Sequence, residues 1–188
     1  MNVYEQCPLV SFEHYLLRLV SKDDCADLLK VYSDPEAVPI FNSDNCNGDD
    51  FHYQTAGRMA QAIDFWLFSF EHHYFVRWSV IDCRTGEAIG TIELFRRDAE
   101  DAFTSTALLR LDLRSDYEHE KALEELLLLI RKHAFDWFDC NSITTKAVPL
   151  AKVRRKVLSQ MGFSESDEAL KGHDGTGYGS YWVYRKHA

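Results

Sequence analysis

The stretch from residue 74 to residue 113 constrains the fold most, because apolar and polar side chains alternate through three successive segments. Tyr74 to Asp82 and Ala88 to Phe95 flank the turn Arg84-Thr-Gly86, which predicts a β-hairpin. Ser105 to Leu113 predicts a third strand. Within it, alternation places one set of side chains on one face, Leu109, Leu111 and Leu113, and a second set on the other, Arg110 and Asp112.

A long amphipathic helix is predicted over His119 to Phe138. Its apolar positions recur every three or four residues and form one stripe, made of Leu123, Leu126, Leu127, Ile130, Ala134 and Trp137. A shorter basic helix is predicted over Ala151 to Met161, and Gly162 stands where a helix end favours glycine. The chain therefore alternates strands with helices over its second half.

The remaining elements follow from shorter signals. Ser21, with Asp24 three residues later, predicts a capped helix that ends before Asp34-Pro35. Further elements are predicted as strands over Tyr15 to Val20, Asn141 to Val148 and Tyr178 to Arg185, and a helix over Phe51 to about Phe70. The resulting order, β-α-α-β-β-β-α-β-α-β, favours one α/β domain over residues 1–188 with a mixed sheet.

Charge and cysteine content limit the class of partner and the compartment. Lys and Arg number 21 against 30 Asp and Glu, a formal net charge of −9, which argues against nucleic acid as a partner. The five cysteines form no CxxC pair, which favours a reducing cytoplasm. Met1 to Pro8 has no signal-peptide pattern, and the longest apolar run, Leu126 to Ile130, is too short for a membrane span.

Metal and thiol chemistry have little support. His119-Glu120 begins like HExxH, but position 123 is leucine, so the second zinc ligand is missing and we expect no metal site. Cys46 lies in the polar stretch Asn42-Ser-Asp-Asn-Cys-Asn-Gly48. It is interpreted as an ordinary loop cysteine, and the alternative is a reactive thiol that pairs in space with His14, His52 or His173.

Phosphate-binding signals are equally incomplete. Neither GxxxxGK[ST] nor GxGxxG occurs. The join between the strand ending at Leu113 and the helix starting at His119 is nevertheless the place where backbone N–H groups and the helix dipole favour an anion. Lys121 would add a cation there, whereas Glu118 and Glu120 would oppose an anion or serve only as first-turn residues.

Four stretches together resemble the GCN5-related N-acetyltransferase (GNAT) family, in particular its ribosomal-protein alanine acetyltransferase branch. They are Leu17-Arg-Leu-Val-Ser-Lys-Asp-Asp-Cys-Ala-Asp-Leu-Leu29 with Ser33-Asp-Pro-Glu-Ala37; Thr85-Gly-Glu-Ala-Ile-Gly-Thr-Ile92; Leu111-Asp-Leu-Arg-Ser-Asp-Tyr117 with Glu125 and Ala134-Phe135; and Lys146-Ala-Val-Pro149 with Val157-Leu158 and Gly162-Phe163. The resemblance implies a single-domain GNAT-like fold, with a mixed, mostly antiparallel central sheet flanked by helices.

The resemblance also implies acetyl-CoA as co-substrate, bound where the strand ending at Leu113 meets the following helix. The family's R/Q-x-x-G-x-G/A loop falls on Glu118, Lys121 and Leu123, with His119 where a further glycine is common, so the signature residues are replaced. The expected contacts are Leu111, Leu113, Glu118, His119, Glu120, Lys121, Ala122 and Arg154. Lys152, Arg154, Arg155 and Lys156 are interpreted either as substitute phosphate ligands or as a solvated helix face.

The late helix departs from the family at further places. Ala151 and Arg154 stand where Asn and Ser usually contact CoA, and Leu158 replaces a tyrosine that some members use as general acid. Leu108 replaces a glutamate often found on the cofactor strand. An alternative therefore stays open, in which a GNAT-fold protein has lost acetyl-CoA binding and serves as a ligand-binding or interaction module.

If the family's chemistry applies, a primary amine attacks the thioester directly in a ternary complex, and a carboxylate takes the proton. Asp112 and Glu93 are the candidate bases, unless they form structural ion pairs, for instance with Arg110. The acceptor, a small molecule or a protein N-terminus, is expected near Asn42, Asp44, Asn45, His173 and Asp174. We expect a monomer or homodimer, without a nucleic-acid or membrane partner.

Overall fold

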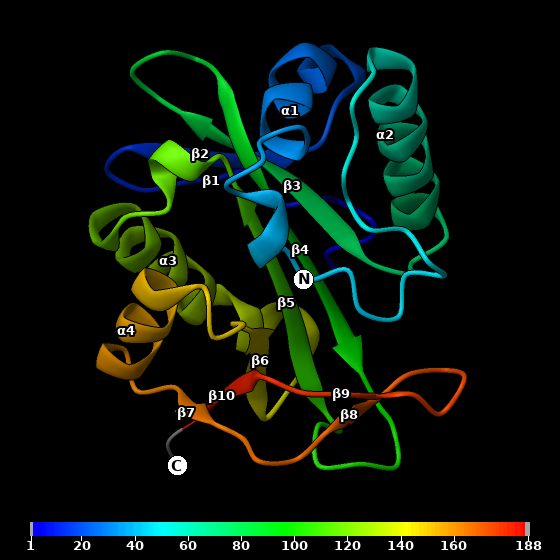
Figure 1. Cartoon of the computed structure of the whole chain (residues 1–188), viewed down its shortest axis with the longest axis vertical. Coiled ribbons are helices and arrows are strands. Elements are labelled where there is room, and N and C mark those ends of the chain that lie inside the picture. The colour runs from blue at the N-terminus through cyan, green and yellow to red at the C-terminus, as the bar shows by residue number, and fades with distance from the viewer. Residues whose placement is uncertain (1, 187–188) are drawn as a thin grey trace.

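An eight-stranded sheet forms the centre of the molecule in a computed structural model that describes residues 2–186 (Figure 1). Its strands run in the order β1 (Val10–Ser11), β2 (Tyr15–Leu19), β3 (Val76–Asp82), β4 (Ala88–Arg97), β5 (Thr106–Leu113), β6 (Ser142–Lys146), β10 (Tyr181–Arg185) and β7 (Ser164–Glu165). Among the described residues, β5 and β6 are the sheet's one parallel pair, and the other neighbours are antiparallel. The α/β fold with a mostly antiparallel mixed sheet is confirmed.

Helices cover both faces of this sheet (Figure 1). On one face, α1 (Cys25–Tyr32) and α2 (Ala56–Glu71) enclose a core with Ile81 and Ala88 of the central hairpin. On the other face, the predicted stripe of α3 (Glu120–Phe138) packs on Trp78 and Ile92, and α4 (Lys152–Gln160) packs beside α3. Because both faces are covered, β3 and β5 are buried along their whole length.

The end of β5 is the feature that matters for the site. The β5–β6 ladder pairs Thr106 through Leu109 with Ser142 through Thr145 and then stops. β5 continues to Leu113, paired on its other side with β4. Residues 110–113 therefore form an edge without a β6 partner, which we call the free edge of β5. The 3₁₀ turn η3 (Ser115–Tyr117) links this edge to α3.

Two predicted boundaries are wrong. The helix expected from Phe51 starts at Ala56, because Phe51 has a left-handed backbone (φ 58°) and the Thr55 side chain caps the first turn. The strand expected over Tyr178 to Arg185 is divided at Ser180 (φ 66°). Its first part, β9 (Gly177–Tyr178), pairs with β8 (Leu170–Lys171) in a separate hairpin, and only β10 joins the sheet.

The other boundaries lie close to their predictions. Ser21 and Asp24 form the expected capping box, although its first turn is the 3₁₀ segment η1 (Lys22–Asp24) that leads into α1. A second 3₁₀ turn, η2 (Val38–Ile40), starts the long connection to α2. Gly162 ends α4 with φ 84°, a backbone that side chains other than glycine rarely adopt. Within residues 2–186, no helix is long and apolar enough to cross a bilayer.

Candidate functional site

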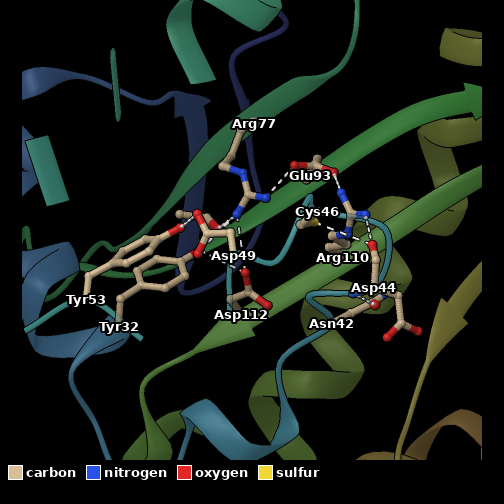
Figure 2. Close-up of polar contacts among 11 residues, drawn as sticks. Tyr32, Asn42, Asp44, Cys46, Asp49, Tyr53, Arg77, Glu93, Arg110 and Asp112 are labelled. Atoms are coloured by element: carbon tan, nitrogen blue, oxygen red, sulfur yellow. Dashed lines mark hydrogen bonds and ion pairs between the residues drawn. The ribbon is translucent and has the colours of Figure 1, made fainter. Parts of the chain in front are cut away.

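A row of buried charges crosses the three central strands on the face that α1 and α2 cover. Arg77 of β3 lies opposite Glu93 of β4, which lies opposite Arg110 of β5. Both guanidinium groups donate to the Glu93 carboxylate, one to each oxygen (Figure 2). Arg77 and Glu93 are each 1% exposed, so the pairs are shielded from solvent. For Glu93, the predicted ion-pair alternative is what the structure shows.

The next row along the strands is anchored by Asp112. Its Oδ2 accepts hydrogen bonds from the Tyr32 hydroxyl at 2.8 Å and from Arg77 Nη1 at 3.2 Å (Figure 2). Tyr32 also lies 2.7 Å from the Thr91 hydroxyl. The other oxygen of Asp112 is buried and has no hydrogen-bond partner among residues 2–186. Asp112 is therefore a fully buried carboxylate with one oxygen unsatisfied.

The two candidate bases differ in their pKa. Burial alone would raise the pKa of Glu93, but the adjacent charges of Arg110 and Arg77 hold it below its ordinary value. Burial raises the pKa of Asp112 above its ordinary value, and the charge of Arg77 offsets only part of that effect. A carboxylate with a raised pKa is the better proton acceptor. The catalytic role of either residue stays a prediction.

The loop between η2 and α2 lies across the ends of these rows. It carries four left-handed residues within seven positions, Asn45, Asn47, Gly48 and Phe51. Such backbone is costly for residues other than glycine and persists only where surrounding contacts hold it. Asp44 supplies such contacts: its carboxylate accepts from Lys146 Nζ at 2.6 Å and from the Tyr181 hydroxyl at 3.0 Å. Its backbone carbonyl accepts from Arg110 Nη2 at 2.9 Å.

Between this loop, α2 and the charged row lies a cavity of about 1030 Å³. Its floor includes Arg77, Glu93 and Arg110. An aromatic wall, which we define by its rings, is formed by Phe51, Tyr53, Phe65, Trp66, Tyr74 and Phe75. The polar loop residues Asn45 to Asp50 form another side. A concave site of this size with few buried polar groups is typical of small-molecule binding.

The predicted acceptor residues are only partly brought together. Asn45 and His173 line the cavity, and the His173 backbone N–H donates to Asn45 Oδ1 at 3.0 Å. Asn42 and Asp44 instead face Tyr181, with Asn42 Nδ2 3.5 Å from its hydroxyl. Asp174 is exposed and accepts from the Thr176 backbone within its own turn. The roles of all five in substrate binding remain predictions.

Cys46 lines the cavity, but its environment does not activate it. Burial raises the pKa of the Cys46 thiol to about 11, and the charge of Arg110 offsets only part of this effect. Its Sγ lies 3.4 Å from the Asp44 backbone carbonyl. A thiol in this state is protonated near neutral pH and is a weak nucleophile. The geometry favours the ordinary loop cysteine over the thiol-enzyme alternative.

Comparison with known proteins places this architecture in a family. The model of the acetyltransferase (GNAT) domain matches residues 14–164. The chain belongs to the GNAT acetyltransferase family. Acetyl transfer is thus the general chemistry of the family to which it belongs. A search of the curated proteins finds no significant match.

Solved GNAT structures share the fold across almost the whole chain. A putative ribosomal-protein-serine acetyltransferase from Vibrio cholerae is 11% identical with a TM-score of 0.72, covering 96% of this chain and 98% of that one. The ribosomal-protein-S5-alanine acetyltransferase from Vibrio fischeri is 18% identical with a TM-score of 0.63 (95% and 96% covered). The ribosomal L7/L12 alpha-N-protein acetyltransferase in complex with coenzyme A is 9% identical with a TM-score of 0.69 (95% and 98% covered).

The residues predicted to contact acetyl-CoA are tied to one another at the free edge of β5. Arg154 of α4 donates from Nη1 to the backbone carbonyl of Leu111 at 2.7 Å. Its Nε and Nη2 form a two-point ion pair with Glu118, both contacts at 2.8 Å. Arg154 is 3% exposed. The guanidinium therefore donates its hydrogen bonds to groups of the chain itself, at the place where the GNAT resemblance puts the cofactor.

At the start of α3, groups expected to contact the cofactor also have partners within the chain. His119 is the N-cap, and its Nδ1 accepts from the Ala122 backbone N–H at 3.3 Å, which removes one donor from the predicted phosphate loop. Glu120 pairs with Lys156 of α4 at 2.5 Å, and Lys121 is exposed. The side chains of Leu111 and Leu113 pack in the core against α3.

Most of the basic side chains of α4 thus form ion pairs with acidic side chains. Arg154 pairs with Glu118, Lys156 with Glu120, and Arg155 with Glu165 at 2.7 Å. Arginine and lysine hold carboxylates with the same donors they would use for phosphate. In this conformation three of the expected cations have carboxylate partners and the loop lacks glycine, while Lys121 and Lys152 are exposed.

Sequence reasoning missed Arg77 and the residues around it. The Arg77 guanidinium lies 4.2 Å from the ring centre of Trp66 and 5.4 Å from that of Phe51. Arg58 and Tyr53 also line the cavity and share Asp49, at 2.5 and 3.0 Å. The turn alone could not have identified this pair, because extending the Ile81–Ala88 pairing from the turn places Arg77 opposite Ile92. A bulge between Val80 and Ile81 shifts the register and brings Arg77 opposite Glu93.

One further group of potential metal ligands lies outside the cavity. Glu13, His14 and Glu125 have ligand atoms within 4.8 Å of one another. Glu125 accepts from both the backbone N–H and Nδ1 of His14, at 2.7 and 2.9 Å. These bonds tie α3 to the start of β2, and nothing further at this group indicates a metal.

Proposed function

We propose that this GNAT-family protein transfers an acetyl group from acetyl-CoA to a primary amine that binds in the cavity. The observation that carries the proposal is the position of the cavity, whose floor includes Arg110, the first residue of the free edge of β5. The resemblance places the thioester at this edge, so an amine bound in the cavity would lie beside it. Direct attack in a ternary complex then needs no covalent enzyme intermediate.

The chain's own residues would bind and orient the amine. The aromatic wall would contact an apolar body, and the loop at residues 45–50 offers polar groups. The attacking amine must be neutral, so its proton has to pass to a base. Glu93 lines the cavity but has a lowered pKa, whereas Asp112 has a raised pKa but is fully buried and does not line the cavity. Position therefore favours Glu93 as the base, and proton affinity favours Asp112.

A second function is favoured by the contacts of Arg154. Its ion pair with Glu118 and its hydrogen bond to Leu111 occupy the predicted cofactor contacts. In this alternative, the protein retains the GNAT fold and the cavity but binds no acetyl-CoA, and it acts as a ligand-binding or interaction module.

Calorimetric titration with acetyl-CoA separates the two functions. Saturable heat, together with acetylation of a primary amine detected by mass spectrometry, is the result expected of an acyltransferase. An absence of both heat and thermal shift at millimolar acetyl-CoA would refute that proposal and leave the binding module. All five cysteines are free, which supports a reducing compartment such as the cytoplasm as part of the proposal.

A further inference from the structure

The floor of the cavity holds hydrogen-bond donors that the protein leaves unused. Arg77 and Arg110 both donate to Glu93 (Figure 2), yet the Nε of each guanidinium is buried without a hydrogen-bond partner among residues 2–186. Arginine keeps its proton and can only donate, so these groups lack an acceptor. Leaving buried donors unpaired is costly. A ligand that reaches this floor gains most if it brings an acceptor oxygen.

The charges that line the cavity are balanced. Arg58, Arg77 and Arg110 contribute three positive charges, and Asp49, Asp50 and Glu93 contribute three negative ones. A polyamine would meet the guanidinium groups, and a polyphosphate would meet the carboxylates, so each would face repulsion. A ligand without net charge that still carries an anionic group for the floor avoids both penalties.

The aromatic wall indicates a third property of the ligand, after an acceptor oxygen and the absence of net charge. It includes Trp66, whose ring centre lies 4.2 Å from the Arg77 guanidinium. Rings of this kind stabilise the apolar or aromatic part of a bound ligand, through burial of apolar area and through stacking. The volume of about 1030 Å³ is ample for a small ligand with such a body.

We propose that the cavity binds a zwitterionic amino acid with an apolar or aromatic side chain. The carboxylate is directed to the arginine floor, and the side chain lies on the aromatic wall. The amine is the group that the proposed acyl transfer requires, and on this point the inference rests on the proposed function. The carboxylate then corresponds to the arginine floor, the apolar body corresponds to the aromatic wall, and the ammonium group balances the charge of the carboxylate.

Three probes with one phenyl body test this inference: phenylalanine, 2-phenylethylamine and 3-phenylpropanoate, titrated by calorimetry without acetyl-CoA. Phenylalanine is expected to bind at least about tenfold more tightly than either analogue, because each analogue lacks one charged hydrogen-bonding group. Equal binding of phenylalanine and 2-phenylethylamine overturns the inference. An absence of saturable phenylalanine binding at millimolar concentration overturns it as well.

The Arg110→Lys variant tests whether the arginine floor binds the carboxylate of the ligand. Lysine keeps a positive charge opposite Glu93 but lacks the Nε donor. The variant should weaken binding of phenylalanine and 3-phenylpropanoate about tenfold and leave that of 2-phenylethylamine unchanged. Arg131→Lys is the matched control, because Arg131 lies on α3 and donates to the Met161 carbonyl, away from the cavity. Equal losses in both variants, or an Arg110→Lys variant that binds like the parent, overturn the role of the floor.

Failure of the inference and failure of the proposed function give different results. Phenylalanine that binds in the cavity but is not acetylated with acetyl-CoA present refutes the acyltransferase and leaves the inference standing. Acetylation of 2-phenylethylamine with the same efficiency as phenylalanine supports the acyltransferase and overturns the inference.

Discussion

The ion pair between Arg154 and Glu118 allows the sharpest prediction, since the same contact bears on both stability and cofactor binding. The two side chains are 3% and 11% exposed and form two hydrogen bonds of 2.8 Å, and Arg154 adds a third, to the Leu111 carbonyl, at 2.7 Å. Removing one partner of a buried pair leaves the other charge uncompensated and typically costs about 3–5 kcal/mol. Arg154→Met and Glu118→Gln should each lower the free energy of unfolding, by about 3 kcal/mol at the lower end of this range because Glu118 keeps some exposure.

Urea unfolding of the double variant completes a double-mutant cycle. With both charges gone, its loss should fall short of the sum of the single losses by at least about 1 kcal/mol. Lys156→Met, which breaks the exposed pair with Glu120, should cost less than about 1 kcal/mol. Additive single losses, or an effect of Lys156→Met equal to that of Arg154→Met, would refute the reasoning.

The same substitution tests how the contact relates to acetyl-CoA. Glu118→Gln removes the carboxylate that occupies Arg154, so the guanidinium becomes available to phosphate. If the protein is an acyltransferase, calorimetry should show acetyl-CoA binding strengthened about tenfold or more, equivalent to about 1.4 kcal/mol. Glu124→Gln is the matched control, because Glu124 is exposed on α3, which begins just after Glu118, and the substitution changes net charge equally. Equal affinities of the two variants would show that the ion pair does not limit cofactor binding.

Three further outcomes are expected. Glu93→Gln should lower the free energy of unfolding in urea by about 3–5 kcal/mol, because two buried guanidinium groups lose their shared anion; a loss under 1 kcal/mol would contradict this. The hydrogen bond from Arg97 lowers the pKa of Asp101 to about 2, so its contribution is present above the unfolded pKa near 3.9 and is lost as pH falls toward 2. Thermal unfolding of Asp101→Asn should therefore depend less on pH between 5 and 2 than that of the parent, and identical slopes would refute the assignment. Cys46 should react with iodoacetamide at pH 7.5 more slowly than exposed Cys83, as peptide mass spectrometry would show, because burial raises the pKa of Cys46 to about 11. Faster labelling of Cys46 would contradict this.

The regular elements could be predicted because their signals are local. Alternation in residues 74–113 defines three central strands, and the stripe from Leu123 to Ala134 defines α3 and its buried face. The prediction failed where single residues decide the backbone. Phe51 and Ser180 adopt left-handed conformations that the sequence pattern does not predict. The first shifts the start of α2, and the second divides the last strand.

The candidate site was harder to predict, since its residues meet only through tertiary packing. Glu93 and Arg110 were recognised as possible ion partners, because they lie on adjacent strands. Tyr53 and Trp66 reach the same cavity from a loop and a helix, and no local pattern links them to Arg77. The placement of Asp44 away from the cavity likewise depends on Lys146, about one hundred residues further along the chain, whose Nζ lies 2.6 Å from its carboxylate.

Apart from Leu108 of β5, the departures from the family pattern and the polar groups of the cavity fall on different elements. Arg154, Glu118 and His119, which replace expected cofactor contacts, lie on α4 and at the start of α3. The cavity is formed instead by β3, β4, β5, α2 and the loop before it. Arg154 bonds to Glu118 and Leu111, neither of which lines the cavity, and sites without shared partners change nearly independently. Ligand binding in the cavity should therefore survive Arg154→Met with its dissociation constant unchanged within about twofold. A tenfold loss of phenylalanine affinity in that variant would show instead that the two sides of the sheet act as one site.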